Sequence, residues 1–262
     1  MNTDKHFDVN RCAVSGQVVR IWDWGEDVLF RVAFVPEGAP SPRQVTMRVP
    51  LGMVNGELVD LAPGDFVRVS GFLESIEFQE SLQDYLRFAR VSDFKETGDG
   101  WNDVTFRRSH TRISVLDVEK IGKGDVSPAS VMLQGVVTRS WPLKQRTAVR
   151  LAVYDEYTTI ITPANGKPER RRPHYATVLM PPGRNARRGE RIRAAGTLSV
   201  RLYREPIERA LLRNGYAELL QKADRDYLEG ISALRSSVSV NAKAVSIFAR
   251  LPRAGLVVNL PE

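Results

Sequence analysis

Arginine and aromatic side chains alternate with apolar residues along several short segments in the second half of the chain. In "TAVRLAVY" (147–154) the apolar residues between them would face a core, so that Arg150 and Tyr154 point to the opposite side. Guanidinium groups neutralise phosphates, and flat aromatic rings offer surfaces on which unpaired bases stack. The alternation and the adjoining turns extend this candidate set to Trp141, Arg170, Arg171, Arg172, Tyr175, Arg193, Arg201 and Tyr203.

The first half carries a sparser set of the same residue types, namely Trp22, Arg31 and Arg68. Trp22 and Trp24 stand in "IWDWGED", where three carboxylates would repel phosphate. The two tryptophans are not both expected in a core, which leaves one of them to stack a base. The first half is therefore expected to bind weakly or to serve assembly.

Each candidate also has a simpler interpretation. Tyr154 and Tyr175 would then cover the sheet beneath inserted helices. The arginines at 170–172 would form a solvated loop, in place of a flap that closes over the strand.

Charge is distributed unevenly along the chain, whose net value is +7. Residues 1–127 hold 15 Lys and Arg against 20 Asp and Glu, a net charge of −5, whereas residues 128–262 hold 23 against 11, a net charge of +12. A segregated basic half attracts polyanions, with nucleic acid first and an anionic membrane surface second. The alternative is that the basic half docks on the acidic one, as in a dimer.

An internal repeat divides the chain. The segments "SGQVVRIW" (15–22) and "QGVVTRSW" (134–141) share a glycine, two valines, an arginine and a tryptophan at an offset of 119. Further matches pair 28–35 with 147–154 at 119, 44–50 with 175–181 at 131, 62–73 with 187–198 at 125, and 112–121 with 237–246 at 125. A duplicated module is predicted: a first domain at 1–122, a linker at 123–128, a second domain at 129–250 and a tail at 251–262.

The repeated segments are predicted to be strands, because their apolar residues alternate with a period of two. Short strands separated by turn signals indicate an all-β barrel or sandwich. The inward residues are expected to be Phe30, Val32, Phe34, Val67 and Val69 in the first module, and Val149, Leu151, Val153, Ile192 and Ala194 in the second. Pro206 to Arg235 has helical spacing and is predicted to form one or two helices. "SLQDYLRFARVSDF" (81–94) fits a helix or a strand.

The second module resembles the bacterial single-stranded DNA-binding protein family in "MLQGVVTRSW", "TAVRLAVYDEYTT", "YATVLM" and "RRGERIRAAGTLSVRLY". The resemblance, applied to both modules, implies an all-β chain of two OB-fold barrels in tandem, and the helical spacing at 206–235 adds a helical insertion in the second, which is atypical of the family. It implies single-stranded DNA as partner, a homodimer that displays four barrels, and service in replication, recombination or repair. The family's acidic tail tip is missing, since this chain ends "GLVVNLPE".

Several other classes of protein are disfavoured by the sequence. A single cysteine and three histidines far apart offer neither a disulfide framework nor a metal site. No phosphate-binding loop, zinc-protease motif or nucleophile elbow is present, so neither an enzyme nor a cofactor is expected. Without a signal-like segment or a membrane-spanning apolar run, a cytoplasmic protein is expected, nucleoid-associated if its host is bacterial. The alternatives left open are an RNA-binding OB-fold protein and a protein-assembly or adaptor module.

Overall fold

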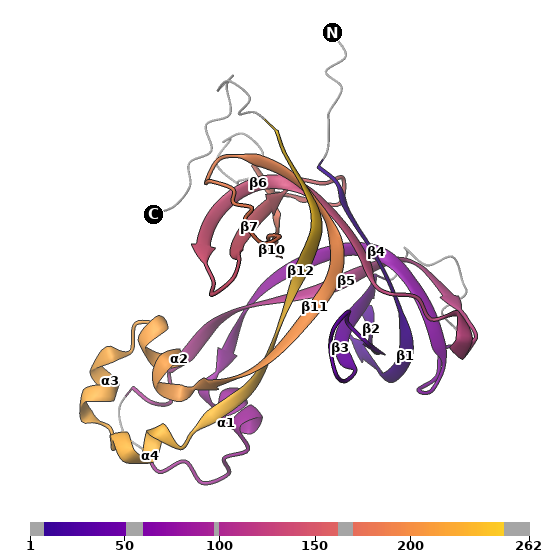
Figure 1. The fold of residues 1–262 in the computed structure, drawn as a ribbon. Helices are drawn as coiled ribbons and strands as arrows, with labels where there is room; N and C mark the ends of the chain where they lie inside the picture. Colours follow the sequence, from indigo (N-terminus) through magenta and orange to yellow (C-terminus); the bar gives the residue numbers. More distant parts are fainter. Residues whose placement is uncertain (1–7, 51–59, 97–99, 162–169, 249–262) are drawn as a thin grey trace.

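A computed structural model describes residues 8–50, 60–96, 100–161 and 170–248. The first ring of strands closes in the order β1-β2-β3-β5-β4-β1, and its pairs are antiparallel apart from β3 with β5 (Figure 1). Its members are β1 (Asn10–Trp24), β2 (Asp27–Phe34), β3 (Arg43–Pro50), β4 (Phe66–Ser81) and β5 (Thr105–Lys120). This closed five-stranded barrel is consistent with an OB fold and confirms the all-β class.

The second half repeats this pairing order. Its ring runs β6-β7-β10-β12-β11-β6, again with a single parallel pair, β10 with β12. Its members are β6 (Ser130–Pro142), β7 (Thr147–Val153), β10 (His174–Leu179), β11 (Arg191–Pro206) and β12 (Ser232–Phe248). The 3-10 turn η2 (Lys123–Asp125) precedes β6, and a separate ribbon pairs β8 (Thr159–Ile161) with β9 (Arg170–Arg172).

The repeated glycines lie where two strands approach too closely for a side chain. A Cβ atom on Gly16 would lie 2.1 Å from the carbonyl oxygen of Ala33, and one on Gly135 would lie 2.5 Å from that of Ala152. Both glycines stand at the same point of their rings, since Ala33 and Ala152 differ by the same offset of 119. The recurring motif thus reflects one steric requirement of a sharply bent first strand.

Strand register supports the sequence alignment of the two halves except at the closing strand. Met47 of β3 pairs with Ile113 of β5, and Val178 of β10 pairs with Val240 of β12. The closing strands therefore correspond at an offset of 127, and the predicted offset of 125 was wrong. A slip of two residues preserves the inward and outward alternation, so the apolar pattern cannot detect it.

One apolar core runs through both rings, which share a ten-stranded sheet. The first strands of the two halves join them, because Asn10–Ala13 of β1 pairs with Ser130–Leu133 of β6. All ten residues predicted to point inward are buried. The described helices include none with the length and apolar character that crossing a membrane requires.

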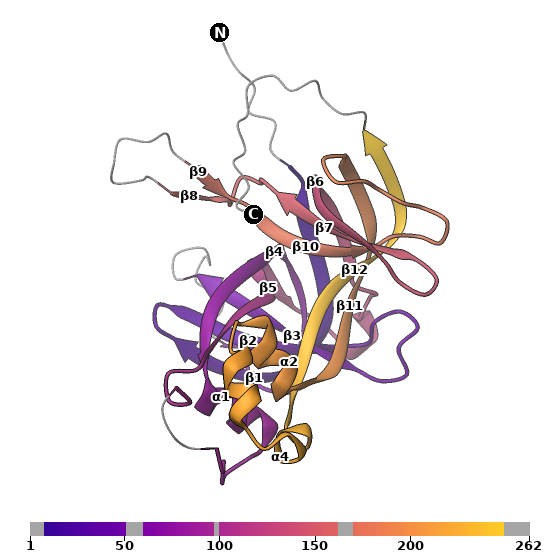
Figure 2. The same cartoon turned by 90° about the vertical axis from the view of Figure 1, so that its left-hand side faces the viewer.

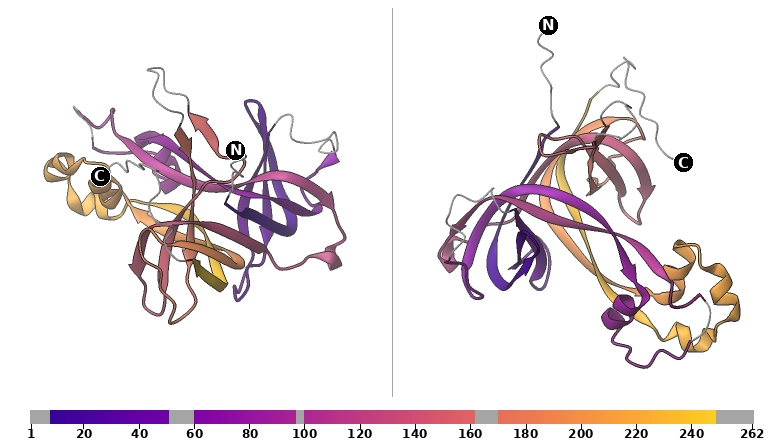
Figure 3. Two further views of the ribbon diagram at one scale, coloured as in Figure 1. Left: turned by 90° about the horizontal axis from the view of Figure 1, so that it is seen from above. Right: turned by 180° about the vertical axis from the view of Figure 1, so that it is seen from behind.

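Two long ribbons extend beyond the barrels and meet at their ends (Figure 3). The β4/β5 ribbon carries α1 (Leu82–Ala89), and the β11/β12 ribbon carries α2 (Ile207–Arg213), α3 (Ala217–Lys222) and α4 (Arg225–Glu229). A second apolar core, including Tyr85, Phe106 and Leu211, packs the ends together. The segment at 81–94, whose sequence fitted either a helix or a strand, begins at the last residue of β4 and then forms helix α1. The segment predicted as one or two helices has three short ones, and its last residues already belong to β12.

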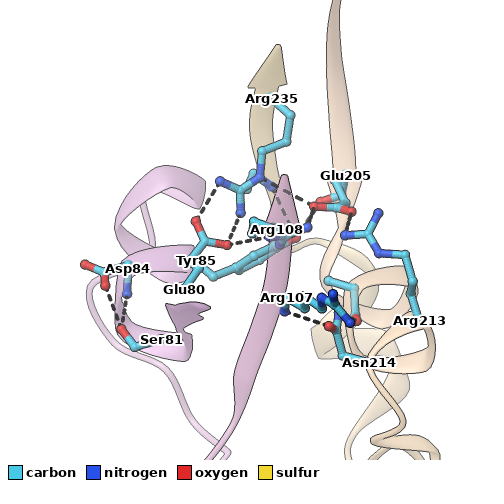
Figure 4. Close-up of polar contacts among 12 residues, drawn as sticks. Glu80, Ser81, Asp84, Tyr85, Arg107, Arg108, Glu205, Arg213, Asn214 and Arg235 are labelled. Carbon is cyan, nitrogen blue, oxygen red and sulfur yellow. Dashed lines mark hydrogen bonds and ion pairs between the residues drawn. The ribbon is translucent and has the colours of Figure 1, made fainter. Parts of the chain in front are cut away.

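A ring of buried charges locks the two ribbons together (Figure 4). The Arg108 guanidinium lies 2.8 Å from the Glu80 carboxylate and 2.6 Å from the Glu205 carboxylate. Arg235 reaches the same two carboxylates at 2.7 and 3.4 Å. The glutamates correspond at an offset of 125 and the arginines at 127, so each ribbon contributes one acid and one base. Because each charge has opposite partners on both ribbons, separating the ribbons would take from each charge one of its two partners.

Candidate nucleic-acid interface

A groove of about 400 Å³ lies between the outer face of the second barrel and the β4/β5 ribbon. Figure 2 shows β10 of that barrel beside β4 of the ribbon. The barrel side contributes Arg139, Trp141, Arg150, Tyr175, Ala176 and Thr177, and the ribbon side contributes Ser75, Ser109 and Thr111. Three of the candidates from sequence, Trp141, Arg150 and Tyr175, are therefore brought together.

Strand register explains why these side chains converge. Arg150 of β7 is paired with Arg139 of β6 on one side and with Thr177 of β10 on the other, which places the three in a row across the sheet. Its neighbours along β7 that share this outward face are alanines, Ala148 and Ala152, and both are buried. Small residues on either side of Arg150 leave room for larger side chains on the flanking strands to lie over the sheet.

The arginines of the groove lie against its aromatic rings. The Arg150 guanidinium carbon lies 4.4 Å from the centre of the Tyr175 ring, and that of Arg139 lies 5.8 Å from the Trp141 ring. These are cation–π distances, at which the ring steadies the guanidinium without neutralising its charge. A guanidinium plane also accepts a stacked base. The groove thus offers cations for phosphate and flat surfaces for bases at one place.

The ribbon wall of the groove is made of hydroxyl groups from the first half of the chain. The backbone N–H of Tyr175 donates a hydrogen bond of 2.8 Å to Ser75 Oγ, which fixes the wall against β10. Ser109 and Thr111 continue the wall on β5. Hydroxyl groups both donate and accept hydrogen bonds, so they suit the varied edges of different bases.

Six groove residues were missed from the sequence, among them Ala176 and Thr177, which follow the predicted Tyr175 on β10. Arg139 had a usable signal, because it precedes Trp141 by two residues on the same strand and so shares its face. Ser75, Ser109 and Thr111 had none, since they lie far away in sequence. Only the packing of the first half's ribbon on the second barrel brings them to the groove.

Two outward residues from the candidate set lie away from the groove. The half-buried Tyr154 has its backbone N–H hydrogen-bonded to Asp8 Oδ2 at 2.9 Å, and burial raises the pKa of its hydroxyl. Arg193 donates to Gln134 Oε1 at 3.0 and 2.8 Å and lies 5.9 Å from the Phe248 ring. Neither residue lines the groove.

Arg201 and Tyr203 are outward and exposed as expected, but they stand on the ribbon part of β11. There they pair with Ser237 and Arg235 of β12, and neither lines the groove. The strand bulges between Ala195 and Gly196 and then leaves the barrel. Continuing the alternation past that point therefore follows the ribbon.

The arginine triplet forms strand β9, paired with β8, so the prediction that these residues lie in a loop was wrong. Arg172 reaches across to the first half, where its Nη2 lies 3.1 Å from Glu77 Oε2. Arg171 is half-buried. Arg170 is described only as a member of the strand, and the loop at 162–169 lies outside the described residues.

The first barrel carries a related arrangement at the equivalent positions. The Trp22 ring lies 5.4 Å from the guanidinium of Arg20 and 5.5 Å from that of Arg31. These three residues correspond at an offset of 119 to Trp141, Arg139 and Arg150. Arg68 instead forms an ion pair with Glu119, with 3.0 Å between Arg68 Nη1 and Glu119 Oε2. Within the described part of the chain, no cluster of three or more His, Cys, Asp or Glu side chains is placed to hold a metal ion.

Comparisons with known proteins find similarity in structure alone. No protein-family model matches the sequence, and no curated protein matches it. The wild-type single-stranded DNA-binding protein of Thermus aquaticus is similar over 95% of this chain and 98% of that one, with a TM-score of 0.49 and 14% identity. A deletion mutant of the Thermus aquaticus protein matches 95% of this chain and 99% of its own, with a TM-score of 0.49 and 13% identity.

Proposed function

We propose that this protein is a non-catalytic, sequence-tolerant binder of single-stranded DNA. The observation that carries the proposal is the groove in which Arg139, Trp141, Arg150 and Tyr175 meet. Binding without sequence preference requires cations that follow the phosphates and rings on which bases stack, and each stacked base is worth about 1–3 kcal/mol. A duplex hides its base faces, so such a groove favours an unpaired strand.

The two rings of strands are, in this proposal, tandem OB-fold domains that arose by duplication, with the helices α2 to α4 inserted in the second. The second domain provides the stronger surface, because its half of the chain carries a net charge of +12 against −5 for the first. A homodimer would display four such domains. The cellular role is protection of exposed strands during replication, recombination or repair, in the cytoplasm and on the nucleoid.

Titration of a fluorescent oligo-dT at several salt concentrations tests the proposal, with a duplex of equal length as control. The single strand is expected to bind more tightly than the duplex. Its affinity should fall by about 0.7 log units per phosphate contact for each log unit of salt. Absence of binding at low salt, or equal affinity for the duplex, would overturn the proposal. Competition by a matched RNA oligomer decides between DNA and RNA as the ligand.

A further inference from the structure

Glu77 places a carboxylate beside the basic groove. It lies on β4 two residues beyond Ser75, so the two side chains share one face of the ribbon. Its register partner on β5 is Ser109, which itself lines the groove. Glu77 therefore lies on the same face of the ribbon as the hydroxyl wall, next to residues that line the groove.

Arginines surround this carboxylate. Glu77 Oε2 lies 2.8 Å from Arg107 Nη2 on the same ribbon and 3.1 Å from Arg172 Nη2 on β9 of the second half. The hydrogen bond from Arg107 lowers the pKa of the carboxyl, and the charges of Arg107, Arg172 and Arg150 lower it further. The Glu77 carboxylate is therefore ionised at neutral pH. It forms ion pairs with two arginine side chains, both of which are more than half exposed to solvent.

The other ribbon has no such pair at the equivalent positions. By the offsets of 125 and 127, Glu77 corresponds to Leu202 and Arg107 corresponds to Leu234. Both leucines are about half exposed, at 49% and 54%. Architecture alone therefore does not require an acid and a base at these positions. The pair occurs on the ribbon that faces the basic groove.

We infer that the Glu77 carboxylate competes with the phosphates of a bound strand for Arg107 and Arg172. A carboxylate held by guanidinium groups occupies the kind of position that a phosphate oxygen takes, because both anions accept the same planar array of donors. A phosphate that takes the Nη2 donors of both arginines must displace Glu77. This inference rests on the proposed function, and it makes Glu77 a residue that limits affinity and keeps the two arginines from other anions.

Glu77→Gln tests the competition, because it removes the charge and keeps the shape. Glu119→Gln is the matched control: it changes the net charge by the same amount on the same pair of strands, where Glu119 pairs with Arg68 at 3.0 Å. Relative to this control, Glu77→Gln is expected to bind oligo-dT about two- to fivefold more tightly at low salt. The slope of log affinity against log salt should steepen by about 0.7 for each additional phosphate contact.

The opposite result has a distinct meaning. If Glu77 only positions Arg107 and Arg172 for the ligand, the glutamine variant binds more weakly than the control, and the competition is refuted. Equal affinity of the two variants also refutes it. In the background of Arg107→Gln and Arg172→Gln together, competition predicts that Glu77→Gln gives no gain. Thermal melts of every variant show whether the fold is retained.

The proposed function and this inference fail in different ways. If the unmodified protein does not bind oligo-dT at low salt, the proposed function is wrong. If the unmodified protein binds and prefers the single strand, yet Glu77→Gln behaves as Glu119→Gln does, only the competition is wrong.

Discussion

Replacing Tyr175 by alanine removes the ring against which Arg150 lies, at 4.4 Å from the ring centre. Loss of one stacking surface costs about 1–3 kcal/mol, which corresponds to a loss of affinity of about 5- to 150-fold. The released guanidinium also loses a cation–π contact worth about 0.5–1 kcal/mol. From the lost stacking surface alone, we expect Tyr175→Ala to weaken oligo-dT binding by about 5- to 150-fold.

The assay is fluorescence anisotropy with labelled oligo-dT, at one fixed low salt concentration. Tyr175→Phe keeps the ring and should stay within about twofold of the unmodified protein. Tyr154→Ala removes a tyrosine that is half-buried but lies outside the groove, and it should leave the affinity unchanged. The reasoning is refuted if Tyr175→Ala, shown by its melting curve to be folded, binds as tightly as the unmodified protein.

Two further predictions concern the relative contributions of the two halves to DNA binding and the buried ion pairs between the two ribbons. Arg150→Ala should weaken binding of oligo-dT more than Arg31→Ala does, because only the first of these arginines stands in the basic half; the reverse order would invalidate the charge argument. Glu205→Gln should lower the free energy of unfolding by about 3–5 kcal/mol, because the largely buried guanidinium groups of Arg108 and Arg235 each lose one of their two carboxylate partners. Urea titration measures this loss, and the exposed Glu119→Gln should cost about 0–1 kcal/mol; equal small losses would mean that the buried ring of charges does not hold the ribbons together.

Strand positions and core residues were predictable because the barrel buries one face of each strand. Burial of one face makes apolar residues recur with a period of two. This period correctly predicted that Phe30, Val32, Val149 and Leu151 lie in the core. The glycines repeated between the halves were equally informative, since close approach of two strands excludes a side chain. Local rules of this kind can be recognised in a single chain without knowledge of distant contacts.

The register of the closing strands and the structure of the ribbons were less accessible. A shift of two residues leaves the alternation intact, so pairing with a neighbouring strand was needed to distinguish 127 from 125. The arginine triplet had no apolar alternation to indicate strand β9. Beyond Gly196 the alternation continues, but the strand departs from the barrel, so Arg201 and Tyr203 keep their outward direction and lose the neighbours they were expected to have.

The candidate site was predictable on one wall only. Trp141, Arg150 and Tyr175 belong to neighbouring strands of one barrel, and their faces follow from alternation. Ser75 and Ser109 come from a ribbon of the other half, and their contribution depends on how the two halves pack. That packing is set by the pairing of β1 with β6, the shared core, the buried charges and the second apolar core, all of which join residues distant in sequence.

Photocrosslinking tests most directly whether this groove holds the strand. A deoxyuridine oligomer with photoreactive 5-iodouracil would be bound at low salt, irradiated, and its attachment points mapped by mass spectrometry. We expect attachment at Trp141 or Tyr175, reduced by an excess of unlabelled oligo-dT. Attachment confined to the first barrel around Trp22, or to the ribbon ends, would contradict it.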